Sequence, residues 1–406
     1  MSNKLSETLQ NKPWLVYVIL SSLFCILFFI SLWVNDRFWL NDFKVYFAAA
    51  QALQNDEPVY GVIHTLGSGF FKYAPVCLLP FIPFTYLPYE VAATLFFVLV
   101  SFAVISVPVF ASKLCNRYFG LNPCALCWVV FLLIVGVHLE RELHLGNVNL
   151  MVLGGVLWVL SDLLKGKQTR AGIVLGIVLL FKLHFLVLLP LLFLRKMWRP
   201  LGISVSVFGI GTLIPILYLG FSKNTELLQQ WVQTIAIHNG SVELSGNTLY
   251  HWLDVTVGAF WPAFPSQMVI LALVALLILF WVLKHLKSEK GRIDSSSSNL
   301  VMEWMVLVAL IPNLVITDTE HFLLGAPLVY TGLVRMRRLS LSVPQRMLII
   351  VGLILYGMNW GDLWGETSVW ITENGMLGLG NALLILAFIW IGENPPQSKK
   401  TEPALV

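Results

Sequence analysis

The fold is decided first by residues 14–34, which read WLVYVILSSLFCILFFISLWV. The stretch carries no charged side chain and has the length of about 20 residues that a helix needs to cross hydrocarbon. Inside lipid each backbone polar group must be satisfied within its own segment, so we expect a helix. The run is too long for the core of a signal peptide and lacks a small-residue cleavage site. We therefore interpret it as a retained first span.

Similar apolar runs recur along the whole chain of 406 residues. The chain is 57% hydrophobic and 12% charged, which is too little charge to cover the surface of a soluble domain. The further runs lie at about 89–112, 123–138, 148–164, 171–194, 200–220, 267–286, 301–316, 321–334, 346–361 and 375–391, with a Pro-broken run at 74–87. We predict an all-α, polytopic transmembrane protein with about 10–12 membrane segments, one domain over 1–392 and a disordered cytoplasmic tail over 393–406.

The basic residues predict the topology. Lys and Arg gather in short loops after the runs that end near 112, 164, 194, 286 and 334, and such loops face the cytoplasm. Both ends of 171–194 are basic, so a single crossing there breaks the alternation. A hairpin of two short helices, or a re-entrant loop, that turns near Lys182 to His184 restores it. We expect a multi-pass protein of the cell membrane with both termini in the cytoplasm, and we expect the Ser295–Ser298 tract to be disordered.

The remaining loops, at 35–88, 139–147, 221–266, 317–320 and 362–374, then face the non-cytoplasmic side. They hold many ionisable residues at or near span ends, where a charge is costly and usually has a role. The large first loop contains an amphipathic stretch, Phe43 to Leu53, that predicts a helix on the membrane surface. We expect the first loop, the turn after 316 and the tip of the hairpin to meet at one cleft. The polar residues in and beside these outward loops that we single out are Asp36, Asp42, Lys44, Asp56, Glu57, His64, Lys72, Glu140, Arg141, Glu142, His144, Asn147, His238, Glu243, Asn247, His251, Asp254, Asp318, Glu320 and His321.

Asp42 follows a Trp-rich span end and precedes the amphipathic stretch. A partly desolvated carboxylate there suits a general base, because burial raises its pKa. The plainer interpretation is a helix N-cap, a position that Asp favours. The two roles are compatible.

Two further sites carry cationic groups. Lys182 and His184 interrupt an apolar run, and a buried ammonium needs a partner such as the phosphate of a lipid; a snorkelling Lys is the alternative. His321 suits phosphate binding or proton transfer, against a plain interfacial His. Arg141 between Glu140 and Glu142 suits a sugar or phosphate, or equally a local ion-pair network. Asp318, Glu320 and His321 match no strong metal-binding spacing, so we expect no metal or other cofactor, although a divalent ion is conceivable.

Several other signals are weak. The net charge of +4, from 26 basic and 22 acidic residues, does not indicate nucleic-acid binding. Cys124 and Cys127 have the spacing of a redox motif, but they open an apolar run without a thioredoxin-like context, so we interpret them as small packing residues. No stretch resembles a P-loop, a dinucleotide fingerprint or a nucleophile elbow.

Taken in order, several short motifs resemble glycosyltransferase family 87. The stretch from Asp42-Phe43 through Pro58 and Tyr60 looks like that family's opening signature, and Phe71 to Pro75 with Leu87-Pro88 is similar to its second. Leu145 to Leu150 resembles its Gly-Gln-Val-Asn-Leu element, with Asn147 in place of Gln. Lys182 with the basic end Arg195–Arg199 also fits, and Gly246 to Leu249 resembles its Asn-Gln-Ser-Leu loop. Ile316 to Pro327 resembles the family's element with two adjacent His residues. In this chain Glu320 replaces the first of them, and His321 is the second.

The resemblance implies a C-type glycosyltransferase fold and an inverting enzyme. Such an enzyme moves a hexose such as mannose from a polyprenyl-phosphate donor to a lipid or glycan acceptor on the non-cytoplasmic face. By analogy Asp42 is the base, and Lys182, His321, Lys72 and Arg141 bind the donor phosphate. Sugar and acceptor contacts then fall to Asn147, Asn149, Asn247, His184 and Glu320. The alternatives are a transporter or lipid flippase, which should show inverted repeats and midplane charges, and a non-catalytic membrane scaffold.

Overall fold

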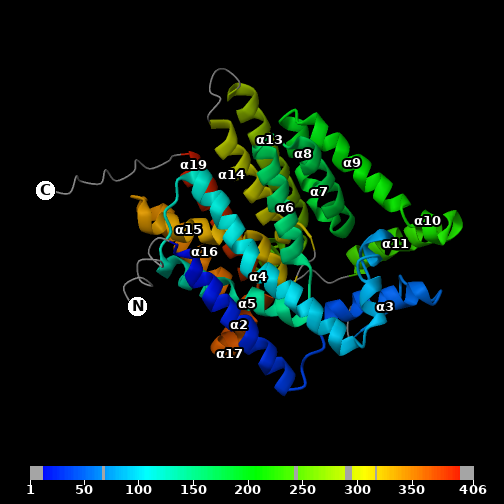
Figure 1. The fold of residues 1–406 in the computed structure, drawn as a ribbon. Coiled ribbons are helices and arrows are strands. Elements are labelled where there is room, and N and C mark those ends of the chain that lie inside the picture. Colours follow the sequence, from blue (N-terminus) through cyan, green and yellow to red (C-terminus); the bar gives the residue numbers. More distant parts are fainter. Residues whose placement is uncertain (1–11, 66–68, 242–245, 289–294, 316–317, 394–406) are drawn as a thin grey trace. The chain divides into compact units, whose positions relative to one another are not determined.

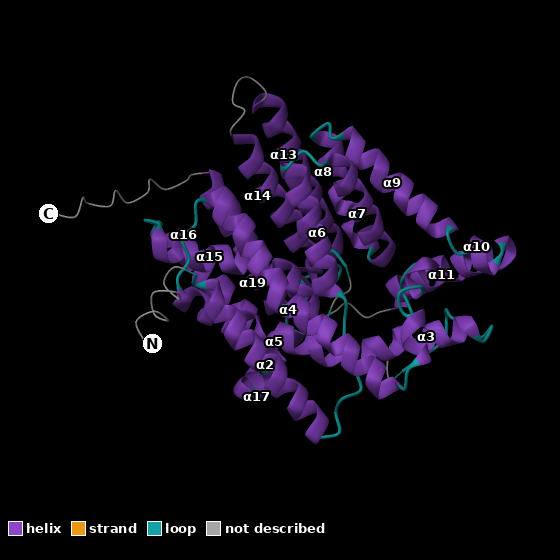
Figure 2. Cartoon of the chain, viewed as in Figure 1, coloured by secondary structure: helices purple, strands orange, loops and turns teal. Residues whose placement is uncertain are grey.

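The computed structural model describes residues 12–65, 69–241, 246–288, 295–315 and 318–393 (Figure 1). These residues form helices joined by turns and short loops, and no strand occurs among them (Figure 2). The all-α prediction is confirmed. The predicted disordered tail, apart from its first residue, lies outside the described residues. The chain divides into two compact units, a first over 1–19, 111–137 and 245–406 and a second over 20–110 and 138–244, while the single-domain expectation stays a prediction.

The second unit holds most of the residues that the sequence singled out. Three helices contribute residues to both units, namely α2 (Trp14–Val34), α4 (Tyr89–Phe119) and α5 (Ala125–Leu145). The other elements of the second unit are α3 (Asn41–Gln54), η1 (Pro75–Leu78), η2 (Ile82–Tyr86), α6 (Asn149–Leu164), α7 (Gln168–Phe181), η3 (Leu183–Val187), α8 (Leu188–Leu194), α9 (Trp198–Leu213), α10 (Ile216–Leu219) and α11 (Phe221–Ser241).

An aromatic cluster fixes α3 in the second unit. Apolar residues at helical spacing bury one side of α3, as the amphipathic pattern predicts. Phe43 stacks on Phe96 of α4 with ring centroids 4.4 Å apart, and Tyr46 lies 4.8 Å from Phe81. Aromatic pairs at such separations add to the stabilisation that burial alone provides. The beginning of α3, where Asp42 lies, is therefore held firmly.

The predicted turn at Lys182 is present, because α7 and α9 run parallel. An added Cβ at Gly172 of α7 meets Ile203 of α9, one at Gly176 meets Val207, and the side chain of Leu180 lies against Gly211. Residues 182–197 must therefore return the chain to the level where α7 begins. The twelve residues of η3 and α8 rise about 20 Å, which matches the 14 residues of α7. The hairpin interpretation of 171–194 is confirmed.

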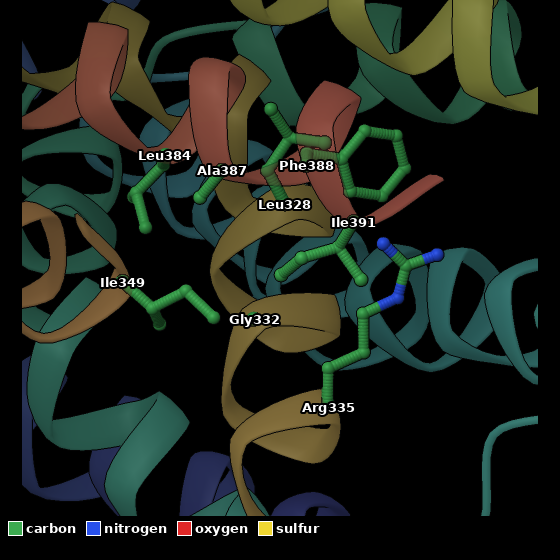
Figure 3. Close-up of a pocket in the computed structure, with 8 residues that line it drawn as sticks. All are labelled: Leu328, Gly332, Arg335, Ile349, Leu384, Ala387, Phe388 and Ile391. Atoms are coloured by element: carbon green, nitrogen blue, oxygen red, sulfur yellow. The ribbon is translucent and has the colours of Figure 1, made fainter. Parts of the chain in front are cut away.

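The first unit contains the helices from residue 249 onward, and α15, α16 and α19 enclose a small apolar pocket in it (Figure 3). Arg335 enters this pocket at the end of α15. Its guanidinium carbon lies 5.1 Å from the ring centre of Phe119 and 5.0 Å from that of Phe388, within cation–π range. The elements are α12 (Leu249–Val257), α13 (Ser266–Ser288), α14 (Ser295–Leu310), η4 (Ile311–Asn313), η5 (Thr319–Gly325), α15 (Ala326–Arg338), α16 (Val343–Gly357), α17 (Gly361–Trp364), α18 (Glu366–Glu373) and α19 (Met376–Glu393).

Three predicted irregular segments are helical instead. The supposed loop at 139–147 is largely the last turns of α5, and much of 221–266 forms α11 and α12. Helix α11 buries Leu227 and Trp231, one turn apart, although its sequence is too polar to stand out as an apolar run. Ser295–Ser298 is the first turn of α14 rather than a disordered tract. A search for apolar runs misses helices and helix ends that carry polar side chains.

Three helices are long and apolar enough to cross a membrane by length and composition, namely α2, α4 and the pair α9–α10. The bent pair α18–α19 makes a fourth if it counts as one span. Several other apolar helices have 10–17 residues. These helices support a polytopic membrane protein, whereas the full number of 10–12 segments stays a prediction.

Candidate functional site

Asp42 lies in the first turn of α3 and is half-buried. Its N-cap interpretation is wrong, because Leu40 occupies that position in a left-handed conformation without a side-chain capping bond. An oxygen of the Asp42 carboxylate accepts a hydrogen bond from Nδ2 of Asn147 at 2.5 Å. The exposed N–H groups at the start of a helix favour an anion. The structure therefore provides a carboxylate oriented by a neighbouring amide.

Gly146 allows Asn147 to reach α3. Its φ is +63°, and an added Cβ would lie 3.1 Å from the Cβ atoms of Leu40 and Phe43. Glycine adopts this backbone conformation without steric cost and permits such a close approach. Oδ1 of Asn147 accepts a hydrogen bond from the N–H of Val148 at 2.7 Å, so the Nδ2 group is the one that faces Asp42. The turn between α5 and α6 therefore sets the orientation of the Asn147 amide.

A second polar chain starts from the same turn and ends at Lys182. Lys182 is 7% exposed and extended between α7 and η3, and its ammonium donates a hydrogen bond to Oδ1 of Asn149. Nδ2 of Asn149 donates to Glu142 at 3.0 Å, and the N–H of Leu150 donates to the other oxygen of Glu142 at 2.8 Å. A buried cation and a buried anion are costly unless they are compensated in this way. Asn149 therefore links the charge of Lys182 to that of Glu142.

Two tyrosines lie between these chains. The hydroxyls of Tyr46 and Tyr73 are 2.9 Å apart, and the ammonium of Lys182 lies 5.8 Å from the ring centre of Tyr73. Burial raises the pKa of Tyr46 well above its ordinary value, and the nearby Tyr73 hydroxyl and Asp42 carboxylate raise it further. Burial likewise raises the pKa of Tyr73. Both phenols therefore stay neutral at physiological pH, and one of them donates the hydrogen bond that joins their hydroxyls.

Three other predicted site residues lie in the second unit. Lys72 is half-buried next to Tyr73, and its main-chain oxygen accepts from the indole of Trp231 at 3.0 Å. Arg141 is exposed, although its neighbour Glu142 is fully buried. His184 is half-buried in η3 with its ring against Phe185. These contacts do not place Lys72, Arg141 or His184 in the polar chains described above, and their roles stay predictions.

Asn247, Glu320 and His321 belong to the first unit. Asn247 is buried just before α12. Glu320 is buried at the start of η5, with its carboxylate 3.4 Å from Nδ1 of His321. The predicted meeting of this turn with the first loop and the hairpin tip stays a prediction. Within the described part of the chain, no group of three or more His, Cys, Asp or Glu side chains could hold a metal ion.

The sequence did not single out Glu142, Tyr46 and Tyr73 for these contacts. Glu142 was grouped with Glu140 and Arg141, whereas the structure turns Glu142 inward and leaves Arg141 outside. Tyr46 has a readable signal, because it lies four residues after Asp42 and so on the same side of a helix. The contact between Glu142 and Asn149 depends on the turn at Gly146, for which the sequence offers only the glycine itself.

The arrangement combines a half-buried carboxylate with a buried ammonium in one unit. The carboxylate can accept a proton, and the ammonium can stabilise a developing anion such as a phosphate. A comparison with known families agrees with such chemistry, because the model of glycosyltransferase family 87 matches residues 70–309. A search among curated proteins finds no match. The match spans Asn147, Asn149, Lys182 and Asn247, while Asp42, Glu320 and His321 lie outside it. The chain belongs to glycosyltransferase family 87 and is a membrane glycosyltransferase.

Proposed function

We propose that the enzyme transfers a hexose, such as mannose, from a polyprenyl-phosphate donor to a hydroxyl group of a lipid or glycan acceptor. The transfer inverts the anomeric carbon and takes place on the non-cytoplasmic face of the cell membrane. The observation that carries the proposal is the placement of Asp42 and Lys182 on two asparagines that are two residues apart. One short segment, 147–149, thus orients a base and a cation in the same unit.

Asp42 serves as the general base in this proposal. The acceptor hydroxyl gives its proton to the Asp42 carboxylate while its oxygen forms a bond to the anomeric carbon. The bond between that carbon and the phosphate oxygen breaks, and both of its electrons leave with polyprenyl phosphate. Attack from the side opposite the leaving phosphate inverts the anomeric centre. The hydrogen bond from Asn147 holds one oxygen of the Asp42 carboxylate in place.

Lys182 serves the leaving phosphate. The phosphate gains negative charge as the glycosidic bond breaks, and a positioned ammonium stabilises that charge most strongly where water is scarce. Asn149 accepts a hydrogen bond from the ammonium and is itself held by Glu142, and the neutral hydroxyl of Tyr73 provides a further nearby donor. No nucleotide is required, because the lipid-linked donor already carries an activated sugar. The predicted donor contacts of Lys72, Arg141 and His321 remain part of the proposal. So do the predicted sugar or acceptor contacts, which are those of Asn147, Asn149, Asn247, His184 and Glu320.

The test uses purified protein in lipid nanodiscs with radiolabelled polyprenyl-phosphate mannose, polyprenyl-phosphate glucose or a nucleotide sugar, and with lipid and glycan acceptors. We expect transfer from a polyprenyl-phosphate donor and none from the nucleotide sugar. Asp42→Asn should lower the rate by about 100- to 10,000-fold, the usual contribution of a general base. Asp56→Asn is the matched control, because Asp56 follows the end of α3 and its carboxylate is exposed. An oxygen of this carboxylate lies 3.9 Å from Nζ of Lys223. Undiminished transfer by Asp42→Asn contradicts the role of Asp42, and efficient use of the nucleotide sugar contradicts the donor class.

The side of the membrane is tested separately. Single cysteines at positions 42 and 141 should react with an impermeant maleimide added outside intact cells. Reaction only after the membrane is made permeable contradicts a non-cytoplasmic site.

A further inference from the structure

Two cysteines at the beginning of α5 lie in unusually close contact. Cys124 directly precedes the helix and is half-buried, whereas Cys127 is buried in its first turn. Their sulfur atoms are 3.0 Å apart, and the backbone N–H of Cys127 donates a hydrogen bond to Sγ of Cys124 at 3.3 Å. Packing alone explains a buried Cys127. Packing does not explain why Cys124, whose thiol is partly exposed, contacts both the thiol and the backbone N–H of Cys127.

The surroundings of Cys124 favour its thiolate form. The thiol of Cys127 and the first N–H groups of α5 point toward its sulfur, and the positive charge of Arg337 from α15 acts on it as well. Helix N-termini and nearby cations are the features that make a cysteine nucleophilic. The three other cysteines, Cys25, Cys77 and Cys115, are buried and serve as internal references.

We propose that Cys124 and Cys127 are a redox-active dithiol that closes to a disulfide by exchange with a low-molecular-weight disulfide. The thiolate of Cys124 attacks one sulfur of that disulfide and expels the other as a thiolate. Cys127 then loses its proton to water, attacks Sγ of Cys124 in the mixed disulfide and expels the second thiolate. Two cysteine thiols are thereby oxidised and one external disulfide is reduced to two thiols.

The topology predicted from the basic residues puts the pair on the cytoplasmic side, where cellular thiols can reduce the disulfide again. Lys113 and Arg117 lie just before it in the sequence, and basic residues of this kind mark cytoplasmic loops. Protein disulfides in a reducing compartment are usually transient and serve redox sensing or catalysis. This inference does not depend on the proposed sugar transfer, because all of its residues lie in the first unit.

The test equilibrates the full-length protein with mixtures of reduced and oxidised glutathione, then traps free thiols with iodoacetamide and analyses the cysteine peptides by mass spectrometry. We expect an intramolecular disulfide between Cys124 and Cys127, recognised by the loss of two hydrogens, while Cys25, Cys77 and Cys115 stay alkylated. In Cys127→Ser, Cys124 should instead accumulate as the mixed disulfide with glutathione. Absence of both products at full oxidation overturns the proposal, provided that the protein elutes as a single species in gel filtration.

A second measurement tests the local electrostatics. In the reduced protein, Cys124 should react with iodoacetamide about tenfold or more faster than Cys115. Arg337→Gln should slow this reaction about twofold, as expected for one exposed charge. Arg346→Gln is the control, because Arg346 is also exposed in the first unit and should leave the rate unchanged. Equal rates for Cys124 and Cys115 overturn the assignment of Cys124 as the attacking thiol.

Discussion

Asp42 and Lys182 stand at the ends of two polar chains that start from the same turn, and the protein holds them in different ways. Asp42 is half-buried at a helix start, with one asparagine orienting it. Lys182 is buried in a break between helices and is linked through Asn149 to the buried Glu142. The difference fits two tasks. A base must meet each arriving acceptor and release the proton afterwards, whereas a cation that receives a phosphate must keep its charge and its place.

We expect the largest effect on stability and activity from a substitution of Lys182, which is the more deeply buried of the two residues. Lys182→Met should lower the free energy of unfolding by about 3–5 kcal/mol, because it removes the ammonium that Asn149 links to the buried carboxylate of Glu142. It should also abolish transfer. The double variant Lys182→Met, Glu142→Gln should recover most of the lost stability without recovering transfer. Thermal unfolding in detergent and the radiolabel assay measure the two effects, and a double variant as unstable as the single one contradicts the charge link through Asn149.

A substitution of Gly146, in the turn that leads to Asn147 and Asn149, should have an intermediate effect on stability and activity. Gly146→Ala places a side chain in a left-handed conformation, which costs about 1–3 kcal/mol, and presses it against Leu40 and Phe43. Asn147 should then lose its contact with Asp42, so transfer should fall as well. Gly166→Ala is the control, because Gly166 has a φ of +71° with nothing within 4 Å of an added Cβ. Equal losses of stability and activity in both variants contradict a positioning role for Gly146.

We expect the smallest effect on stability and activity from a substitution of Tyr73, whose hydroxyl contacts that of Tyr46. Tyr73→Phe removes a neutral hydrogen bond to Tyr46, which costs about 0.5–1.5 kcal/mol. Because the Tyr73 hydroxyl lies near the proposed phosphate position, the variant should raise KM for the donor more than it lowers kcat. Tyr86→Phe alters an exposed hydroxyl elsewhere in the second unit and should change neither constant. A fall in kcat alone in Tyr73→Phe contradicts a role in donor binding.

Much of the fold could be predicted from the sequence because lipid leaves the backbone little choice. Apolar runs correctly predicted α2 and α6, and the two basic ends of 171–194 correctly predicted the break at Lys182. Helix α11 and the end of α5 were missed, since their polar side chains conceal the helical period. The length of a helix that continues beyond hydrocarbon depends on tertiary contacts, such as those of Glu142, which no local pattern reveals.

The candidate site was predicted less completely. Asp42 and Lys182 stood out because a charge beside an apolar run is costly. The contacts of Asp42 with Asn147 and of Lys182 with Asn149 did not stand out, because they depend on the left-handed turn at Gly146. Glu142 was grouped with Glu140 and Arg141 as a sugar or phosphate contact or an ion-pair network, and only the rotation of α5 shows that Glu142 faces inward while Arg141 faces out. Asp42 and Asn147 are 105 residues apart in the sequence, and Asn149 and Lys182 are 33 residues apart, so these contacts are a property of the folded chain and not of local sequence.

In the proposed reaction, Asp42 takes the proton of the acceptor and does not bind the donor. The most direct test compares Asp42→Asn with the wild-type enzyme in two measurements on the same preparation, namely binding of polyprenyl-phosphate mannose and the rate of a single turnover with acceptor. We expect donor binding within about twofold of wild type and a single-turnover rate at least about 100-fold lower. Donor binding and sugar transfer at the wild-type rate by Asp42→Asn would show that Asp42 is not the base.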